Sequence, residues 1–377
     1  MLINLFGVFF HLFEIPLLVF LLCAVALQYV YNDMTIRLSN GIRVLWMFIF
    51  LYLYICAILL SSINAIEVSI VFKSTVKWVE VSLTSLLLLI YLSNMKRFKI
   101  IYWTLFASAF LFILVRLIDV IYGRVNFFTY RIFPGIEAVF CVALLMPFLK
   151  NRWKWFYFLF FFSMVSSILS LSRTAWLALA VCLGGYLSIQ RSLRGLVYVL
   201  AGALAVLGMI YFGGRELLTY RVGELASGTS GSNVERVALL HVAFRAIADH
   251  PFIGVGSLNF SRYMVKEGML EGIISPNLDT LGPHNAFLQV ASEEGLLGLL
   301  FFSLVIYFVL RLLIDAFKYS SVERQYLYGL CFFFIVTLFN LTFGFIAAHF
   351  RFFLALLIGM AAATMRLPSQ AQQKAEQ

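Results

Sequence analysis

Long apolar runs, separated by short polar segments, make up most of this chain. Each run has roughly the twenty residues that an α-helix needs to cross a bilayer. The runs are continuous and do not alternate between apolar and polar residues, so membrane-spanning strands are not predicted. Spans are predicted near 14–31, 44–63, 75–94, 100–122, 133–149, 153–171, 174–190, 195–213, 285–312, 326–347 and 351–366. The pattern therefore predicts an all-α polytopic integral membrane protein with about 11 transmembrane helices (about 10 to 12), in which residues 1–13 add a half-helix or extend the first span.

Composition agrees with a membrane protein and argues against a nucleic-acid partner. Charged residues make up 12% of the 377 residues and hydrophobic residues 63%, whereas a soluble protein has about 25% charged residues. The net charge of +10 could indicate nucleic-acid binding, but the basic residues cluster in short loops between spans, as the positive-inside rule requires. We therefore expect membrane lipids around the protein and no nucleic acid.

No metal or cofactor motif is found. The five cysteines lie inside apolar segments without the spacing of a metal site or a redox pair, and we interpret them as small buried hydrophobic residues. Gly254 and Gly256 are too few for a nucleotide fingerprint and follow no predicted strand. The first span lacks a basic leader region, so no cleavable signal peptide is expected. We expect neither metal nor cofactor.

The basic loops predict the orientation of the spans. Four short loops fall on one side, which the positive-inside rule makes cytoplasmic; they hold Lys96, Arg97, Lys99, Lys150, Arg152, Lys154, Arg191, Arg194, Lys318 and Arg324. The large loop 214–284, with six basic and seven acidic residues, then lies outside. The predicted organisation is a transmembrane bundle over 1–213, this loop, transmembrane helices over 285–366 and a disordered cytoplasmic tail over 367–377.

The large loop is predicted to contain one helix, at about 233–249. Ser232 and Glu235 fit a capping box at its start, and Pro251 prevents its continuation. Arg236 and Arg245 are nine residues apart and face opposite ways on a helix. Arg236 shares its face with Leu240, Ala243 and Ile247, which predicts that this face packs against something, whereas Arg245 is on the predicted solvated face. Arg236 is the preferred binding candidate and Arg245 the second.

His284 is the principal catalytic candidate, because it lies where the large loop returns to the membrane. An imidazole titrates near working pH and can act as general base on a hydroxyl; the alternative is that His284 and Asn285 only end the loop and cap the next helix. Glu293 and Glu294 lie nine and ten residues further on. Two interpretations stay open for them: a buried pair with a partner or a role, and a loop-facing pair at a broken helix.

Arginines at span ends are candidates for binding an anion. Arg173 lies between two predicted spans with almost no loop, where it either clamps a phosphate or extends to the interface. His349 and Arg351 lie at the outer end of the last pair of spans. They either line the same cavity or anchor the protein at the interface.

Three sequence segments together resemble the O-antigen ligase and polymerase superfamily of bacterial envelope glycosyltransferases, over roughly residues 160–312. The first is Leu171-Ser172-Arg173-Thr174-Ala175-Trp176. The second is Arg236 with Leu240, followed by Asp249-His250-Pro251-Phe252-Ile253-Gly254-Val255-Gly256. The third is His284-Asn285, with Gly295-Leu296-Leu297-Gly298 after ten intervening residues.

The resemblance implies a GT-C-like inner-membrane enzyme that moves a glycan from undecaprenyl diphosphate to an acceptor on the periplasmic face. His284 would then be the general base, Arg173 and Arg236 would bind the diphosphate with Asn285 and Arg245 beside them, and no metal would take part. The spacings favour a ligase that transfers glycan to the lipid A core. Alternatives are a repeat-unit polymerase, which uses a second glycan as acceptor, a protein O-oligosaccharyltransferase, and a transporter of lipid-linked glycan without chemistry.

Overall fold

The computed structural model describes residues 38–121, 135–149, 173–190, 231–271, 273, 281–343, 348–365 and 367. Every regular element in these ranges is a helix. Four helices are long and apolar enough to cross a membrane: Gly41–Ile63, Val68–Tyr91, Gly295–Tyr319 and Arg324–Thr342. The prediction of an all-α polytopic membrane protein is confirmed in this form. The predicted spans near 14–31, 153–171 and 195–213, residues 1–13 and nearly all of the tail lie outside the described residues.

The chain divides into two compact units, each made of separate stretches of sequence. The first unit contains residues 1–98, 236–322 and 345–377, and the second contains 99–235 and 323–344. The first unit holds α2 (Leu38–Leu60), η1 (Ser61–Ile63), α3 (Val68–Tyr91), most of α10 (Gly231–Asp249), α11 (Phe260–Lys266), α12 (Ala286–Glu293), α13 (Gly295–Tyr319) and α15 (Ala348–Thr364). The second holds most of α4 (Met95–Ile121), α5 (Gly135–Leu145), η2 (Met146–Leu149), α7 (Arg173–Gln190) and α14 (Arg324–Phe343).

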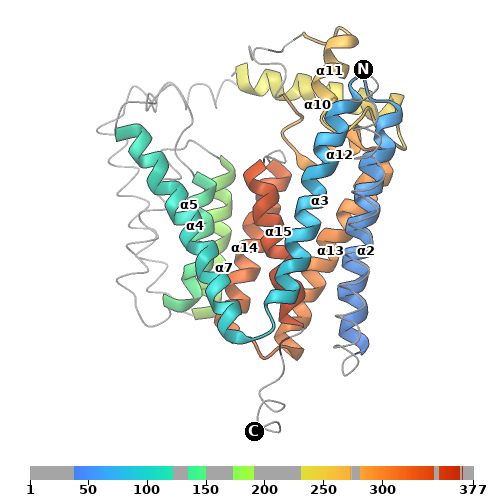
Figure 1. The fold of residues 1–377 in the computed structure, drawn as a ribbon. Coiled ribbons are helices and arrows are strands. Elements are labelled where there is room, and N and C mark those ends of the chain that lie inside the picture. The colour runs from blue at the N-terminus through green and yellow to red at the C-terminus, as the bar shows by residue number, and fades with distance from the viewer. Residues whose placement is uncertain are drawn as a thin grey trace. The chain divides into compact units, whose positions relative to one another are not determined.

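The long helices of the first unit lie side by side, with α10, α11 and α12 at one end of them (Figure 1). Tyr54 of α2, Trp78 of α3 and Phe302 of α13 join three helices, with ring centroids 4.8 to 6.0 Å apart. Gly359 lets α15 approach α3, because a Cβ there would lie 2.7 Å from the Leu88 Cβ. At the end away from α10, Arg43 of α2 forms an ion pair with the buried Asp315 of α13.

In the second unit, α14 packs against α5 and α7. The Tyr102 hydroxyl of α4 donates a hydrogen bond to the Leu144 carbonyl over 2.6 Å, and Gly329 of α14 leaves room for that hydroxyl. An ion pair of 2.6 Å between Lys99 and Glu323 connects the starts of α4 and α14.

The predicted span near 285–312 is wrong in one respect, because two helices replace it. Helix α12 ends at Glu293, and α13 begins at Gly295. Gly295 has a φ of 73°, in the left-handed region that interrupts a right-handed helix. The membrane-crossing helix therefore starts about ten residues later than predicted, and Glu293 and Glu294 precede it.

Candidate functional site

The segments Pro251–Gly256 and Ser292–Leu297 are joined backbone to backbone in the first unit. The amides of Val255 and Gly256 donate to the carbonyls of Ser292 and Glu293 over 3.0 and 2.9 Å. In the other direction, the amides of Leu296 and Leu297 donate to the carbonyls of Pro251 and Phe252 over 2.8 and 3.3 Å. Two of the segments that carry the family resemblance are therefore in direct contact.

This contact depends on two glycines with positive φ. A Cβ on Gly254 (φ 70°) would lie 2.3 Å from the Glu293 carbonyl oxygen, and one on Gly295 (φ 73°) would lie 2.3 Å from the backbone of Phe252. Both the dihedral angle and the close approach exclude a side chain. The two glycines therefore allow the backbones to pair.

The connection between α2 and α3 joins the same place. The Ser257 amide donates to the Ser61 hydroxyl over 3.0 Å, and the Asn64 side chain donates to the Gly254 carbonyl over 3.0 Å. The Glu67 amide donates to Asn259 Oδ1 over 2.8 Å. We call the three joined segments, residues 61–67, 250–260 and 292–297, the junction.

Two buried carboxyl groups lie at the centre of the junction. Glu293 Oε2 accepts hydrogen bonds from the Leu258 amide over 2.9 Å and from Gln289 Nε2 over 3.3 Å. Glu294 Oε1 accepts one from the Ser257 hydroxyl over 2.6 Å. Burial raises the pKa of both carboxyl groups above the ordinary value for glutamate. Two alternatives were predicted for these residues: a buried pair with partners, and a pair at a break in the helix. The structure has both the buried pair and the break.

His284 lies immediately before α12 in a strained backbone conformation. Its φ is 49°, which is uncommon for a residue with a side chain and occurs preferentially at functional sites. Its side chain is half-buried, so the imidazole is in part accessible to a substrate. The geometry places a base-capable side chain at a fixed helix end.

Asn285 is the N-cap of α12. Its Oδ1 accepts a hydrogen bond from the Leu288 amide over 3.0 Å. The predicted capping function of this residue is therefore present, and its substrate-binding function stays a prediction.

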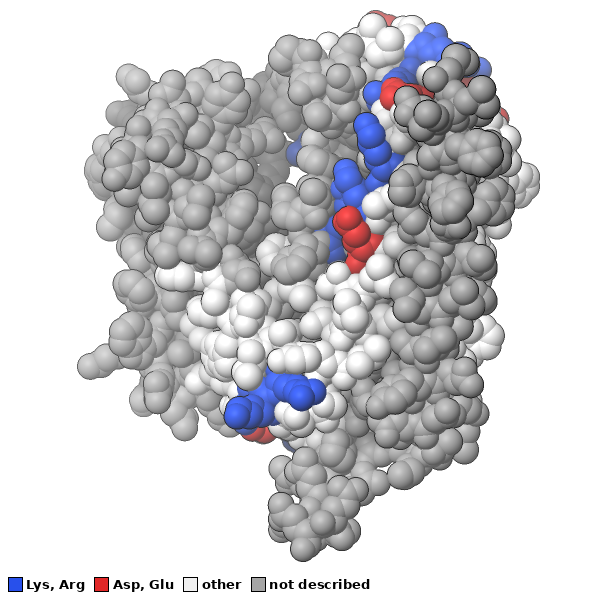
Figure 2. All heavy atoms as spheres, in the orientation of Figure 1, with Lys and Arg blue, Asp and Glu red and all other residues white. Residues whose placement is uncertain are grey.

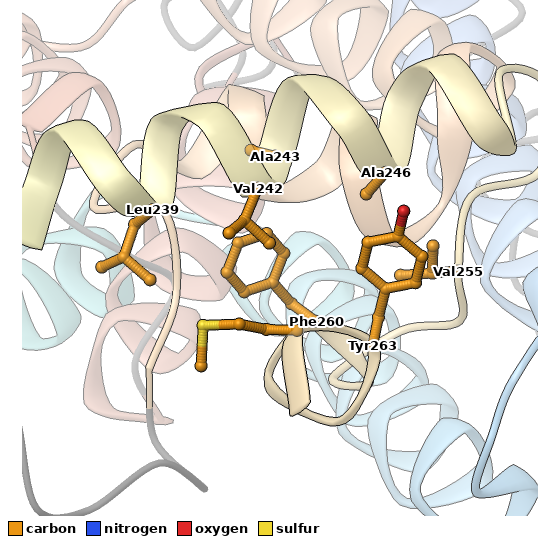
Figure 3. Packing of buried hydrophobic residues seen from close by; sticks show 8 residues of the cluster. Leu239, Val242, Ala243, Ala246, Val255, Phe260 and Tyr263 are labelled. Carbon is orange, nitrogen blue, oxygen red and sulfur yellow. The ribbon is translucent and has the colours of Figure 1, made fainter. Parts of the chain in front are cut away.

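Helix α10 begins at Gly231 and ends at Asp249, close to the predicted 233–249. Ser232, predicted to precede the helix, is inside it. The predicted packing face is right for the buried Ala243 and the half-buried Ile247 but wrong for Arg236 and Leu240. Both side chains are exposed, and the buried stripe, which packs on α11 (Figure 3), consists of Leu239, Val242, Ala243 and Ala246. Four well-separated apolar positions decide which face is buried, and Arg236 lies at the edge of that face.

Arg245 lies on the solvated face, as predicted. It forms an ion pair of 3.1 Å with Asp249, whose carboxylate also accepts a hydrogen bond of 2.6 Å from the Tyr263 hydroxyl. The Tyr263 hydrogen bond, and then the Arg245 charge, lower the pKa of Asp249. Arg173 is the first residue of α7 in the second unit, and its side chain lies outside the described residues.

Sequence reasoning missed a band of charge on α3. Lys73, Lys77 and Glu80 fall within about 60° of one another around the helix; Lys73 and Glu80 are exposed and Lys77 is half-buried. Figure 2 shows basic and acidic atoms gathered in a narrow band over this helix. The spacing i, i+4, i+7 within an apolar run was the available signal. Charged side chains on a bilayer-length helix require water, a partner or a ligand beside them.

Arg351 of α15 is buried, with 8% of its surface exposed. It therefore does not lie at the protein surface, as an interfacial anchor would. Its charge interacts with Tyr54, Glu80 and Glu293. The side chain of His349 lies outside the described residues. Within the part of the chain that the structure describes, no group of three or more His, Cys, Asp and Glu side chains could hold a metal ion.

The described residues thus define a helical membrane protein with a rigid, hydrogen-bonded junction beside a strained histidine. Residues 158–303 match the family model described as O-antigen ligase, which supports the resemblance to the O-antigen ligase and polymerase superfamily and to a glycosyltransferase-like enzyme. The match includes Arg173, Arg236 and His284. No curated protein matches the chain.

Proposed function

We propose that the protein is a ligase-type glycosyltransferase of this superfamily. It transfers a glycan from undecaprenyl diphosphate to a sugar hydroxyl of the lipid A core at the periplasmic face of the inner membrane. The observation that carries the proposal is the position of His284. The residue is half-buried, has a left-handed backbone and directly precedes the N-cap of α12, inside the matched domain.

In the proposed reaction, His284 accepts the proton of the acceptor hydroxyl. The oxygen attacks the anomeric carbon of the donor, a new glycosidic bond forms, and the bond to the diphosphate breaks. The diphosphate leaves with the electron pair and needs positive charge more than a proton. Arg173 and Arg236 supply this charge in the proposal, and Arg245 and Asn285 contact the substrate nearby. The mechanism uses no metal.

The band on α3 supports an anionic substrate in the membrane. Lys73, which is exposed, and Lys77, which is half-buried, place two ammonium groups on one side of a helix long enough to cross a bilayer. Such groups are stable at that depth beside an anionic headgroup or water. A lipid diphosphate fits both the charge and the location.

The experiment uses a host that lacks its own ligase and compares wild type with His284→Ala on a lipopolysaccharide gel. Wild type should give long glycan on the lipid A core, and His284→Ala should lose transfer by at least about 100-fold, the effect of removing a general base. His241→Ala, which removes an exposed histidine on α10, is the control.

Other outcomes identify the alternatives. If a second host, which keeps its ligase but lacks its polymerase, puts only single repeats on the core and the protein restores long glycan there, the protein is a polymerase. Transfer to a protein hydroxyl identifies an O-oligosaccharyltransferase. If purified protein forms no product but lipid-linked glycan still crosses vesicles, the protein is a transporter. Equal activity of His284→Ala and wild type contradicts the mechanism.

A further inference from the structure

The exposed side chains of α13 form one apolar stripe along nearly the whole helix. Five large hydrophobic side chains are 39% to 52% exposed: Leu296, Leu300, Tyr307, Leu310 and Ile314. At 100° per residue they fall within about 80° of one another around the helix. Residues 296 and 314 are 18 positions apart, which is about 27 Å along the axis. The hydrocarbon core of a bilayer is about 30 Å thick, so the stripe has the length of the region that acyl chains cover.

Helix α2, which packs beside α13 (Figure 1), carries a matching stripe. Ile42, Trp46 and Leu60 are exposed and fall within about 40° of one another around the helix. Residues 42 and 60 are also 18 positions apart, again about 27 Å. Arg43 pairs with Asp315 at the end remote from the junction, so the two helices run in opposite directions. Both stripes therefore end at the junction.

Two exposed apolar residues of the junction lie where these stripes end. Phe252 is 67% exposed, and its carbonyl accepts a hydrogen bond over 3.3 Å from the Leu297 amide in the first turn of α13. Ile63 is 71% exposed and directly precedes Asn64, whose side chain donates to the Gly254 carbonyl. A single exposed apolar side chain is ordinary, but these two continue surfaces that are already apolar.

We propose that Phe252 and Ile63 insert among the lipid acyl chains at the edge of the bilayer and anchor the junction at the membrane surface. When the two stripes fill the hydrocarbon core, both residues lie at its boundary, about 15 Å from the bilayer centre. An apolar side chain gains free energy there by leaving water, as in interfacial membrane segments. Lipid is the occupant because the surfaces that Phe252 and Ile63 continue belong to helices long enough to cross a membrane.

The backbone of the 251–252 segment suits this position. Irregular backbone at membrane depth needs partners within the protein, because acyl chains offer none. The carbonyls of Pro251 and Phe252 accept hydrogen bonds from the amides of Leu296 and Leu297 over 2.8 and 3.3 Å. Although this segment belongs to the large loop by sequence, its apolar edge then lies in lipid and the junction lies in the headgroup layer. The inference does not depend on the proposed function.

The experiment measures the depth of a fluorophore attached to the full chain at Phe252→Cys or Ile63→Cys. Each variant is placed, one copy per nanodisc, in phospholipid brominated either near the headgroup or near the chain end, and the ratio of quenching by the two lipids gives the depth. Both labels should lie about 15 Å from the bilayer centre. Tyr307→Cys, 11 positions beyond residue 296 and so about 16 Å deeper, should lie near the centre. Lys266→Cys, exposed at the end of α11, should escape quenching, and labelled wild type gives the background.

Two results would overturn the proposal. If the label at Tyr307→Cys is quenched but those at Phe252→Cys and Ile63→Cys are not, the junction edge lies in water. If disulfide cross-links form between copies of Phe252→Cys in liposomes and the quenching of its label is lost there, a second copy of the chain is the occupant. Ile63→Cys tests the same boundary from a different segment, should Phe252→Cys fail to fold. Because these measurements need no transfer activity, they stand or fall separately from the proposed function.

Discussion

Single residues determine the junction through backbone conformation. Gly295 and Gly268 both have positive φ, 73° and 67°, but only Gly295 faces a close backbone neighbour, Phe252. Around Gly268 nothing lies within 4 Å of an added Cβ. The two glycines therefore separate the cost of the dihedral angle from the cost of the clash.

We predict that Gly295→Ala destabilises the protein by about 3 kcal/mol or more, and Gly268→Ala by about 1 kcal/mol. The first substitution adds steric conflict with Phe252 to the strain of a left-handed alanine, and the second adds the strain alone. Thermal or denaturant unfolding in detergent measures both. Equal losses of stability would show that α12 and α13 can separate from the 251–256 segment at little cost.

The Glu294 carboxyl gives the protein a predicted pH dependence. Burial, and then the charge of Glu293, raise its pKa in the folded state. A raised pKa contributes stability that is fully present below the unfolded value, about 4.3, and is lost as pH rises through the folded pKa. The Tm of wild type should therefore fall as pH rises from about 4.3 through the raised pKa of the folded state. Glu294→Gln should make the Tm depend less on pH over this range. The groups facing Glu294 are Tyr54 of α2, Glu293 and Ser257. If Glu294→Gln keeps the full wild-type dependence of Tm on pH, another group is responsible for the titration.

Elements were predictable where an apolar run ends in polar residues. The predicted helices at 174–190 and 233–249 agree with α7 and α10 over the described residues, and Pro251 marks the end of α10. The break between Glu293 and Gly295 was only one of two interpretations, since apolar residues continue on both sides of it. The backbone pairing with residues 251–256 has no signal in the local pattern, because it depends on a segment about forty residues away in the chain.

The candidate site shows the same limit. His284 and its capping neighbour Asn285 were found because a loop-to-helix boundary is visible in sequence. The buried face of α10 was assigned correctly for Ala243 but wrongly for Arg236 and Leu240, since Arg236 is at the edge of an apolar stripe and 100° steps do not resolve an edge. The role of Arg351 could not be decided from the sequence, because the burial of an arginine near a helix end depends on which carboxylates other helices bring to it.

At the scale of a helix, α3 is predicted to bind an anionic lipid headgroup. Lys73→Gln and Lys77→Gln should each raise the donor KM about tenfold, with a smaller effect on kcat, because each removes a charge–charge contact made in both the ground and transition states. Lys266→Gln, exposed at the end of α11, is the matched control. Binding of a polyprenyl diphosphate to the variants, titrated at two salt concentrations, measures the effect. Unchanged affinity in both variants would show that water, and not a lipid headgroup, contacts Lys73 and Lys77.

For the whole molecule, the distribution of basic residues predicts which end of the helices faces the cytoplasm. Lys96 and Arg97 follow the end of α3, in the first turn of α4, and Lys318 lies at the end of α13. Both ends are remote from the junction, since α3 starts beside Asn259 and α13 starts beside Pro251. The positive-inside rule puts these lysines and arginines in the cytoplasm. We therefore predict that the junction, α10 and α11 face the periplasm.

Cysteine substitution tests this orientation directly. Lys266→Cys at the end of α11 should react with a membrane-impermeant maleimide added to intact cells with a permeable outer membrane, whereas Lys318→Cys in the last turn of α13 should react only after the inner membrane is opened. The native cysteines in the described residues are buried or half-buried, so wild type gives the background. The reverse labelling pattern would place His284 on the cytoplasmic side, where a glycan already carried across the membrane could not reach it. In that case the ligase proposal would fail even though the junction kept its structure, because the chemistry proposed for His284 needs donor and acceptor on the same side as the imidazole.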